Sequence, residues 1–154
     1  MFPNNFVVYN VMADVYEHQK MFGEAFPARQ QALAIQKDPT VTALAEAYKH
    51  SGYRGWLLKK IEILERAPPQ PIQALHRESH LDMFKSFGIA YFYTLLNDEA
   101  HAMPYLERAY EGGNPYVMFL QVDPNWGPIR PSQRFQDLVR RIGLPETVNG
   151  QELN

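Results

Sequence analysis

Three tyrosines, Tyr16, Tyr48 and Tyr93, constrain the fold of this 154-residue chain most, because one pattern surrounds all three. An alanine stands three residues before each tyrosine, and an apolar residue stands four before it. A small or aliphatic residue follows nine residues after each tyrosine, and another follows seven residues later. A spacing that recurs in this way is a repeat, and its three- and four-residue steps indicate helices. The pattern therefore predicts an all-α chain built from repeated helix pairs.

Turn-forming residues between the apolar stretches divide the chain into antiparallel helical hairpins. Asp38-Pro39 separates the first hairpin from the second, and Ser51-Gly52 is the predicted turn inside the second. The tyrosine interval grows from 32 residues (48 − 16) to 45 (93 − 48), which leaves room for an additional short helix at 72–77. We expect one domain over residues 1–145 with hairpins at about 6–37, 40–67 and 81–111, a cap at 116–143 and a flexible tail at 146–154.

The predicted cap follows the third hairpin. Tyr116 to Val122 is nearly all apolar and is predicted to form one or two helical turns. Pro131 is placed at the start of a last helix that runs to Ile142. A stack of hairpins needs such an element, because its last repeat would otherwise expose an apolar face.

Composition excludes several classes of protein. The chain has no cysteine, so disulfides and thiolate metal sites are ruled out. Its net charge is −2 without a basic cluster, which gives nucleic-acid binding by this domain little support. No apolar run approaches the ~20 residues that cross a bilayer, so we expect no membrane span and a cytoplasmic location.

A family resemblance rests on residues that keep the same distances from the tyrosines, among them Met12-Ala13, Leu44-Ala45, Ile89-Ala90, Ala25, Ala32, Leu57, Leu64, Ala102 and Ala109. It also rests on the proline turns Asp38-Pro39 and Asn114-Pro115, which follow the first and third hairpins. In these positions the chain resembles the tetratricopeptide repeat (TPR) family. The final stretch, from Leu120-Gln121-Val122-Asp123-Pro124 to Gly143-Leu144-Pro145, resembles the end of TPR regions in bacterial signalling and transcription regulators. Arg29 departs from the family pattern, which usually has an aromatic residue there.

The resemblance implies an α-solenoid of about three TPR-like hairpins that binds a protein or peptide in a concave groove, without catalysis or a cofactor. It also implies that a DNA-binding, kinase or cyclase domain precedes such a region in the regulators. The first helix of each hairpin would line the groove. By spacing from each tyrosine, the expected groove residues are Asn10, Asp14, Glu17, His18, Thr42, Glu46, Lys49, His50, Phe87, Tyr91 and Thr94.

The charges of these residues suggest what the groove would bind. TPR domains that bind terminal carboxylates use a clamp of lysines and asparagines, whereas Asp14 and Glu46 occupy the clamp-like positions here and would repel a carboxylate. A basic or amide-rich segment beside an apolar anchor fits better, with Phe87 and Tyr91 holding the anchor.

Two histidines open a metal-binding alternative. Asp14 and His18 are four residues apart, as are Glu46 and His50, so each pair shares one helix face. Together these four could present two imidazoles and two carboxylates to a divalent metal. The simpler interpretation is a solvated polar face. A further group, His76, Glu78 and His80, lies in the predicted linker with spacing that suits no helical zinc motif.

Three alternative functions are consistent with these sequence features. The first is a binding scaffold inside a bacterial regulator. The second is self-association into a homodimer through the apolar tail and an outward-facing Trp56, although core packing is the expected role of that tryptophan. The third is a metal-dependent enzyme using the four groove residues. No nucleophile with an adjacent base is visible, so we expect a non-catalytic protein.

Overall fold

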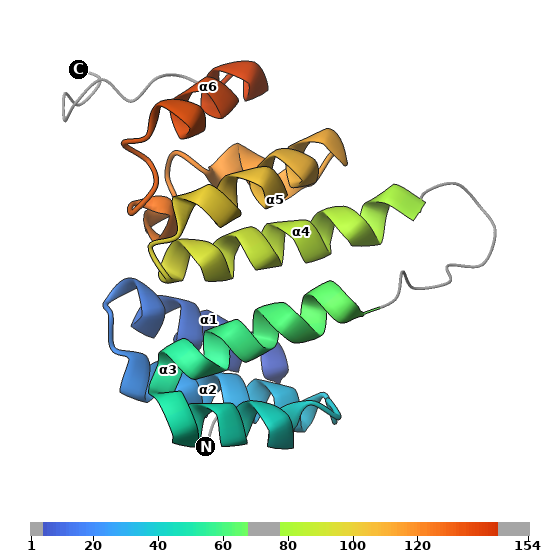
Figure 1. Ribbon diagram of the computed structural model, residues 1–154, viewed down its shortest axis with the longest axis vertical. Coiled ribbons are helices and arrows are strands. Elements are labelled where there is room, and N and C mark those ends of the chain that lie inside the picture. Colours follow the sequence, from blue (N-terminus) through green and yellow to red (C-terminus); the bar gives the residue numbers. More distant parts are fainter. Residues whose placement is uncertain (1–4, 68–77, 145–154) are drawn as a thin grey trace. The chain divides into compact units, whose positions relative to one another are not determined.

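The computed structural model describes residues 5–67 and 78–144, and side chains are described for these except at 78–82. The described residues are helical with no strand, as Figure 1 shows. The chain divides into two compact units, Met1–Ala67 and Pro68–Asn154. Each unit is described by itself below. The expectation of one stacked domain over 1–145 stays a prediction. The expected helix at 72–77, His76 and the tail at 146–154 lie outside the described residues.

The first unit contains α1 (Phe6–His18), α2 (Phe22–Ile35) and α3 (Val41–Arg66). Helices α1 and α2 form an antiparallel pair (Figure 1). Ala25, Ala28 and Ala32 on α2 are all buried and form a seam of small side chains. Alanine side chains are small, so they let the backbones of α1 and α2 approach closely.

Helix α3 is two helical segments joined by a sharp turn. Ser51 (φ −140°, ψ 20°) and Gly52 (φ 60°, ψ −155°) leave the helical region, and Figure 1 shows the chain folding back there. The predicted turn of the second hairpin is therefore confirmed. Tyr48 of the first segment stacks on Phe26 of α2, with ring centroids 3.6 Å apart and planes 7° apart, so the second hairpin packs on the first.

The backbone conformation repeats with the same spacing as the three tyrosines. The residue four positions after each tyrosine has positive φ: 58° at Lys20, 60° at Gly52 and 59° at Asn97. The carbonyl oxygen of Tyr16 accepts a hydrogen bond from the amide five residues later at 2.8 Å, and that of Tyr93 does so at 3.0 Å. This bond, together with a left-handed residue, is the Schellman ending of a helix. The repeat thus specifies where the first helix of each hairpin ends.

The second unit contains α4 (Glu78–Leu95), α5 (Glu99–Glu111), two 3₁₀ turns, η1 (Pro115–Phe119) and η2 (Pro124–Trp126), and α6 (Gln133–Ile142). Helices α4 and α5 pair as the third hairpin. The turns and α6 add Trp126, Phe135 and Leu138 to the core of that hairpin, and all three are buried.

Polar contacts attach α6 to α5. The Tyr110 hydroxyl donates to the Arg141 carbonyl oxygen at 3.0 Å, and the Arg134 guanidinium forms two bonds with Glu107 at 2.9 and 2.7 Å. The predicted start of the last helix at Pro131 was two residues early. The Ser132 side chain accepts from the amide of Phe135 at 3.1 Å and caps the helix, which begins at Gln133.

None of the helices in the described residues is both long and apolar enough to cross a membrane.

Candidate functional site

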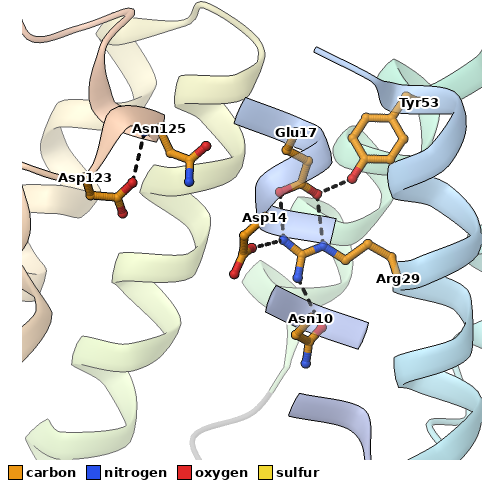
Figure 2. Close-up of polar contacts among 7 residues, drawn as sticks. All are labelled: Asn10, Asp14, Glu17, Arg29, Tyr53, Asp123 and Asn125. Atoms are coloured by element: carbon orange, nitrogen blue, oxygen red, sulfur yellow. Dashed lines mark hydrogen bonds and ion pairs between the residues drawn. The ribbon is translucent and has the colours of Figure 1, made fainter. Parts of the chain in front are cut away.

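The expected groove residues of the first hairpin form an internal ion-pair network instead of an open polar surface. Arg29 on α2 makes a two-point pair with Glu17, with Nε–Oε1 at 2.9 Å and Nη2–Oε2 at 2.7 Å (Figure 2). The same guanidinium contacts Asp14 Oδ1 at 2.5 Å and Asn10 Oδ1 at 3.1 Å. One cation therefore gathers three side chains of α1.

Glu17 is also tied to α3. Its Oε1 accepts a short hydrogen bond from the Tyr53 hydroxyl, so the carboxylate joins all three helices of the first unit (Figure 2). Burial raises the pKa of Tyr53 far above its usual range, and the negative charge of Glu17 adds to the rise. The phenol is therefore protonated near neutral pH and donates its hydrogen bond to Glu17.

Position in the repeat explains why an arginine lies inside. Arg29 stands thirteen residues after Tyr16, and the equivalent residues in the other hairpins are Ile61 and Leu106. Both of these are buried, at 3% and 0% exposure. The packing of the hairpin directs this position inward, so an arginine there must bring a buried counter-charge. Glu17 supplies it.

These contacts correct the expected acidic end of the groove. Glu17 is 2% exposed and cannot meet a ligand. Asp14 is partly exposed but shares Arg29, and Asn10 also bonds to that arginine. The paired charges weaken the electrostatic selectivity that Asp14 was expected to supply. His18 is exposed at the end of α1.

The second hairpin places Thr42, Glu46, Lys49 and His50 on its exposed surface. Lys49 Nζ lies 2.6 Å from Glu46 Oε1, and this hydrogen bond is the main reason that the pKa of Glu46 falls below its usual range. Glu46 therefore has a cation beside it, as Asp14 does. The repulsion of anionic ligands that these two carboxylates were expected to cause is weakened at both positions.

The three predicted groove residues of the third hairpin differ in their exposure. Thr94 is fully buried, and its hydroxyl donates to the Ala90 carbonyl oxygen at 2.9 Å, so the prediction that it lines a groove was wrong. Phe87 and Tyr91 are partly exposed and pack edge-on against Trp126, with ring centroids at 5.1 and 6.1 Å. The buried indole holds both rings in place.

Phe87 also lines an open pocket that the sequence did not reveal. The other lining residues are Tyr116, Phe119, Val122 and Asp123, and the cavity volume is about 400 Å³. We call this set the aromatic pocket. Tyr116 is 52% exposed, Phe119 56% and Val122 73%. The available signal was the apolar run from Tyr116 to Val122, which a short 3₁₀ turn cannot bury on every side.

Two caps hold this apolar run in place. The Asn114 side chain accepts from the Tyr116 amide at 2.8 Å and donates to the Met83 carbonyl oxygen at 3.1 Å. The Asp123 side chain accepts from the Asn125 amide at 3.0 Å (Figure 2). These hydrogen bonds cap the backbone of the two turns that carry the pocket residues.

A second open pocket, of about 430 Å³, lies on the first unit between α1 and α2. It is lined by Tyr9, Met12, Tyr16, Glu24, Pro27, Ala28 and Gln31. It contains the first of the repeated tyrosines. The equivalent tyrosine of the second hairpin, Tyr48, is covered by Phe26.

The geometry does not support the hypothesis of a metal site. In residues 5–67 and 83–144, the structure brings no three His, Cys, Asp or Glu side chains together as metal ligands. Asp14, His18, Glu46 and His50 therefore do not form a shared site. Asp14 and Glu46 have Arg29 and Lys49 as partners instead.

Core packing, the expected role of Trp56, is confirmed, and the alternative of an outward-facing Trp56 is contradicted. Trp56 is 1% exposed and stacks on Tyr53 with ring centroids 5.3 Å apart. The dimer patch that an exposed Trp56 would have provided does not exist.

Comparison with known proteins identifies no relative: the chain matches no protein-family model, no curated protein and no solved structure.

Proposed function

We propose that this chain is a non-catalytic binding module that captures a protein or peptide partner, and that the aromatic pocket holds the anchoring side chain. The observation that carries the proposal is the exposure of Tyr116, Phe119 and Val122 around one cavity. Large apolar side chains gathered at a soluble protein's surface mark interaction sites. Of the residues expected in the groove, Phe87 keeps its role as part of the anchor.

The rigidity of the pocket supports binding rather than loose packing. Asn114 and Asp123 cap the two 3₁₀ turns, and Trp126 supports Phe87 from the core. A preformed surface spares a partner the entropic cost of ordering it, so a short peptide could bind with useful affinity.

We also propose that the hairpins belong to a TPR-like scaffold of a bacterial regulator. Support comes from the tyrosine repeat, the positive-φ residue four positions after each tyrosine, and the stacking of Tyr48 on Phe26. In this proposal the chain recruits a partner for a signalling or DNA-binding domain elsewhere in the regulator.

A display selection tests the binding proposal. The immobilised full chain is presented with a random peptide library, and enriched peptides are synthesised and titrated by fluorescence anisotropy. We expect a shared motif whose binding weakens at least about tenfold in Phe119→Ala, which removes an exposed anchor ring. Phe6→Ala, an exposed phenylalanine of the first unit, is the matched control. If no peptide binds, or both variants bind as the wild type does, the proposal is wrong.

Self-association is the second candidate, and a different observation favours it. Val7, Val11 and Val15 are 50%, 55% and 48% exposed, and their four-residue spacing places them along one face of α1. A second copy could cover this stripe. Light scattering over a range of concentrations tests the idea: a dimer that Val11→Lys dissociates supports it, and a monomer at every concentration excludes it.

A further inference from the structure

We infer that the aromatic pocket recognises an alkylammonium group, the chemistry of a lysine side chain or its methylated forms. The inference rests on the proposed peptide-binding function and names the side chain that the partner inserts. It follows from three aromatic residues and one aspartate that line a single cavity.

The rings provide the first half of the argument. Phe87, Tyr116 and Phe119 all line the cavity, and the ring centroids of Phe87 and Tyr116 are 5.9 Å apart with planes tilted by 40°. Tilted rings around one cavity present π faces from different directions. A cation on an alkyl stem gains from each face within about 6 Å, and alkylation of the ammonium strengthens the preference over water.

Asp123 provides the second half. Asp123 lines the pocket, and its carboxylate accepts a hydrogen bond from the Asn125 amide. Among the described side chains, Lys, Arg and His form no ion pair with it. Arg130 is nearby, but its Nη2 donates to backbone carbonyl oxygens, that of Asp123 at 2.8 Å and that of Leu120 at 3.4 Å. The carboxylate therefore remains available to a cation from outside.

Charge complementarity selects the occupant. An uncharged apolar side chain would take water from the Asp123 carboxylate without replacing its hydrogen bonds, which costs free energy. A phosphate or carboxylate ligand would be repelled. An ammonium on a methylene stem satisfies both surfaces, because the stem packs on Val122 and the rings while the charge faces Asp123.

The size of the cavity agrees with this occupant. Its volume of about 400 Å³ lies at the lower end of the range of ~300–1,000 Å³ for small-ligand pockets. The pocket is open to solvent, so a side chain can enter while its peptide backbone stays outside.

The experiment uses the full ¹⁵N-labelled chain and two pairs of probes of similar shape. Tetramethylammonium and n-butylammonium are titrated against neutral neopentyl alcohol and n-butanol at constant ionic strength, and amide shifts are followed by NMR. We expect the cations to shift amides between Tyr116 and Asn125 at concentrations where the neutral probes do not. The two cations distinguish a methylated ammonium from an unmodified one.

Variants of two pocket residues separate charge from shape. Asp123→Asn keeps the cap on the Asn125 amide, because asparagine caps as well as aspartate, but it removes the charge. We expect it to weaken cation binding by about threefold or more. Asp137→Asn, an exposed carboxylate on α6, is the matched control and should have no effect. Phe119→Leu keeps apolar volume and should weaken only the cations.

The inference is overturned if the neutral probes bind as well as the cations, if no probe shifts the pocket amides, or if Asp123→Asn binds as the wild type does. Failure here leaves the binding module standing, because the peptides selected by display would then anchor through an uncharged side chain. Conversely, cation shifts without any bound peptide would overturn the binding module and leave the cation pocket.

Discussion

Glu17 and Arg29 form a two-point ion pair inside the first hairpin, and Arg29 stands where the other hairpins bury Ile61 and Leu106. The pair joins α1 to α2, and the side chain of Glu17 is fully buried while that of Arg29 is 12% exposed. A buried pair of this kind holds the two helices in one arrangement, because any shift would leave a charge without its partner.

Removing one member of this pair should be far more harmful than removing both. Arg29→Leu introduces the residue of the third hairpin, but it leaves Glu17 charged and buried, so we expect a loss of about 3–5 kcal/mol in the free energy of unfolding. Glu17→Thr with Arg29→Leu reproduces the Thr94 and Leu106 combination and should recover at least half of that loss. Urea denaturation measures both. A double variant as unstable as the sum of the singles would contradict the coupling.

Tyr53 should ionise only when the chain unfolds. Its pKa is raised by burial and by Glu17, so its contribution to stability is complete below the ordinary value of 10.0 and is lost as the pH rises above it. In a tyrosinate absorbance titration, Tyr53→Phe and wild type should therefore show equal amplitudes before unfolding. A smaller amplitude in the variant would show that Tyr53 titrates in the folded chain. Tyr53→Phe should also cost about 1–3 kcal/mol near neutral pH, because Glu17 loses a buried donor.

Gly52 should tolerate no side chain without loss of stability. Its φ of 60° and ψ of −155° lie in a region that only glycine occupies readily, although a Cβ there would meet nothing within 4 Å. We expect Gly52→Ala to cost about 1–3 kcal/mol from backbone strain alone. Gly23→Ala, in α2 without positive φ or a close neighbour, should instead stabilise the chain by about 0.4–1 kcal/mol. Equal effects in thermal unfolding would refute the strain argument.

The bond between α5 and α6 should weaken in acid. The hydrogen bond from Arg134 is the main cause that lowers the pKa of Glu107 below its ordinary value of 4.5. This contribution is therefore complete above pH 4.5 and is lost as the pH falls through the lower folded pKa. Because Arg134 is half exposed, Glu107→Gln should cost less than about 1 kcal/mol near neutral pH and nothing in strong acid. Glu111→Gln, 68% exposed, should change little at either pH. A Glu107→Gln deficit that persists in acid would contradict the ion-pair argument.

Local information in the sequence was sufficient for the helices and their ends. The tyrosine spacing predicted repeated helix pairs, and the positive φ of Lys20, Gly52 and Asn97 recurs with the same spacing. The turn at Ser51-Gly52 was predicted from its residue types and is confirmed by its non-helical backbone. Hydrophobic periodicity and turn-forming residues act over a few positions, so they can be recognised without knowledge of the tertiary contacts.

The assignment of side chains to core or surface depended on contacts between distant segments. From residue type alone, Arg29 and Glu17 are expected at the surface. In the folded chain they lie between α1, α2 and α3 and bind one another. Thr94 fails as a groove residue for a similar reason, since a buried hydroxyl can bond to its own helix.

By itself, the sequence determined an all-helical chain, the repeat, and the ends of its hairpins, because these depend on backbone preferences and spacing along the chain. Only the tertiary structure decided which charges are buried and which rings surround the aromatic pocket. Phe87 on α4 precedes Tyr116 by 29 residues (116 − 87), yet it lines one cavity with Tyr116, Phe119 and Asp123, and its ring packs against that of Trp126. Burial is a property of what neighbouring elements contribute, and no local pattern encodes it.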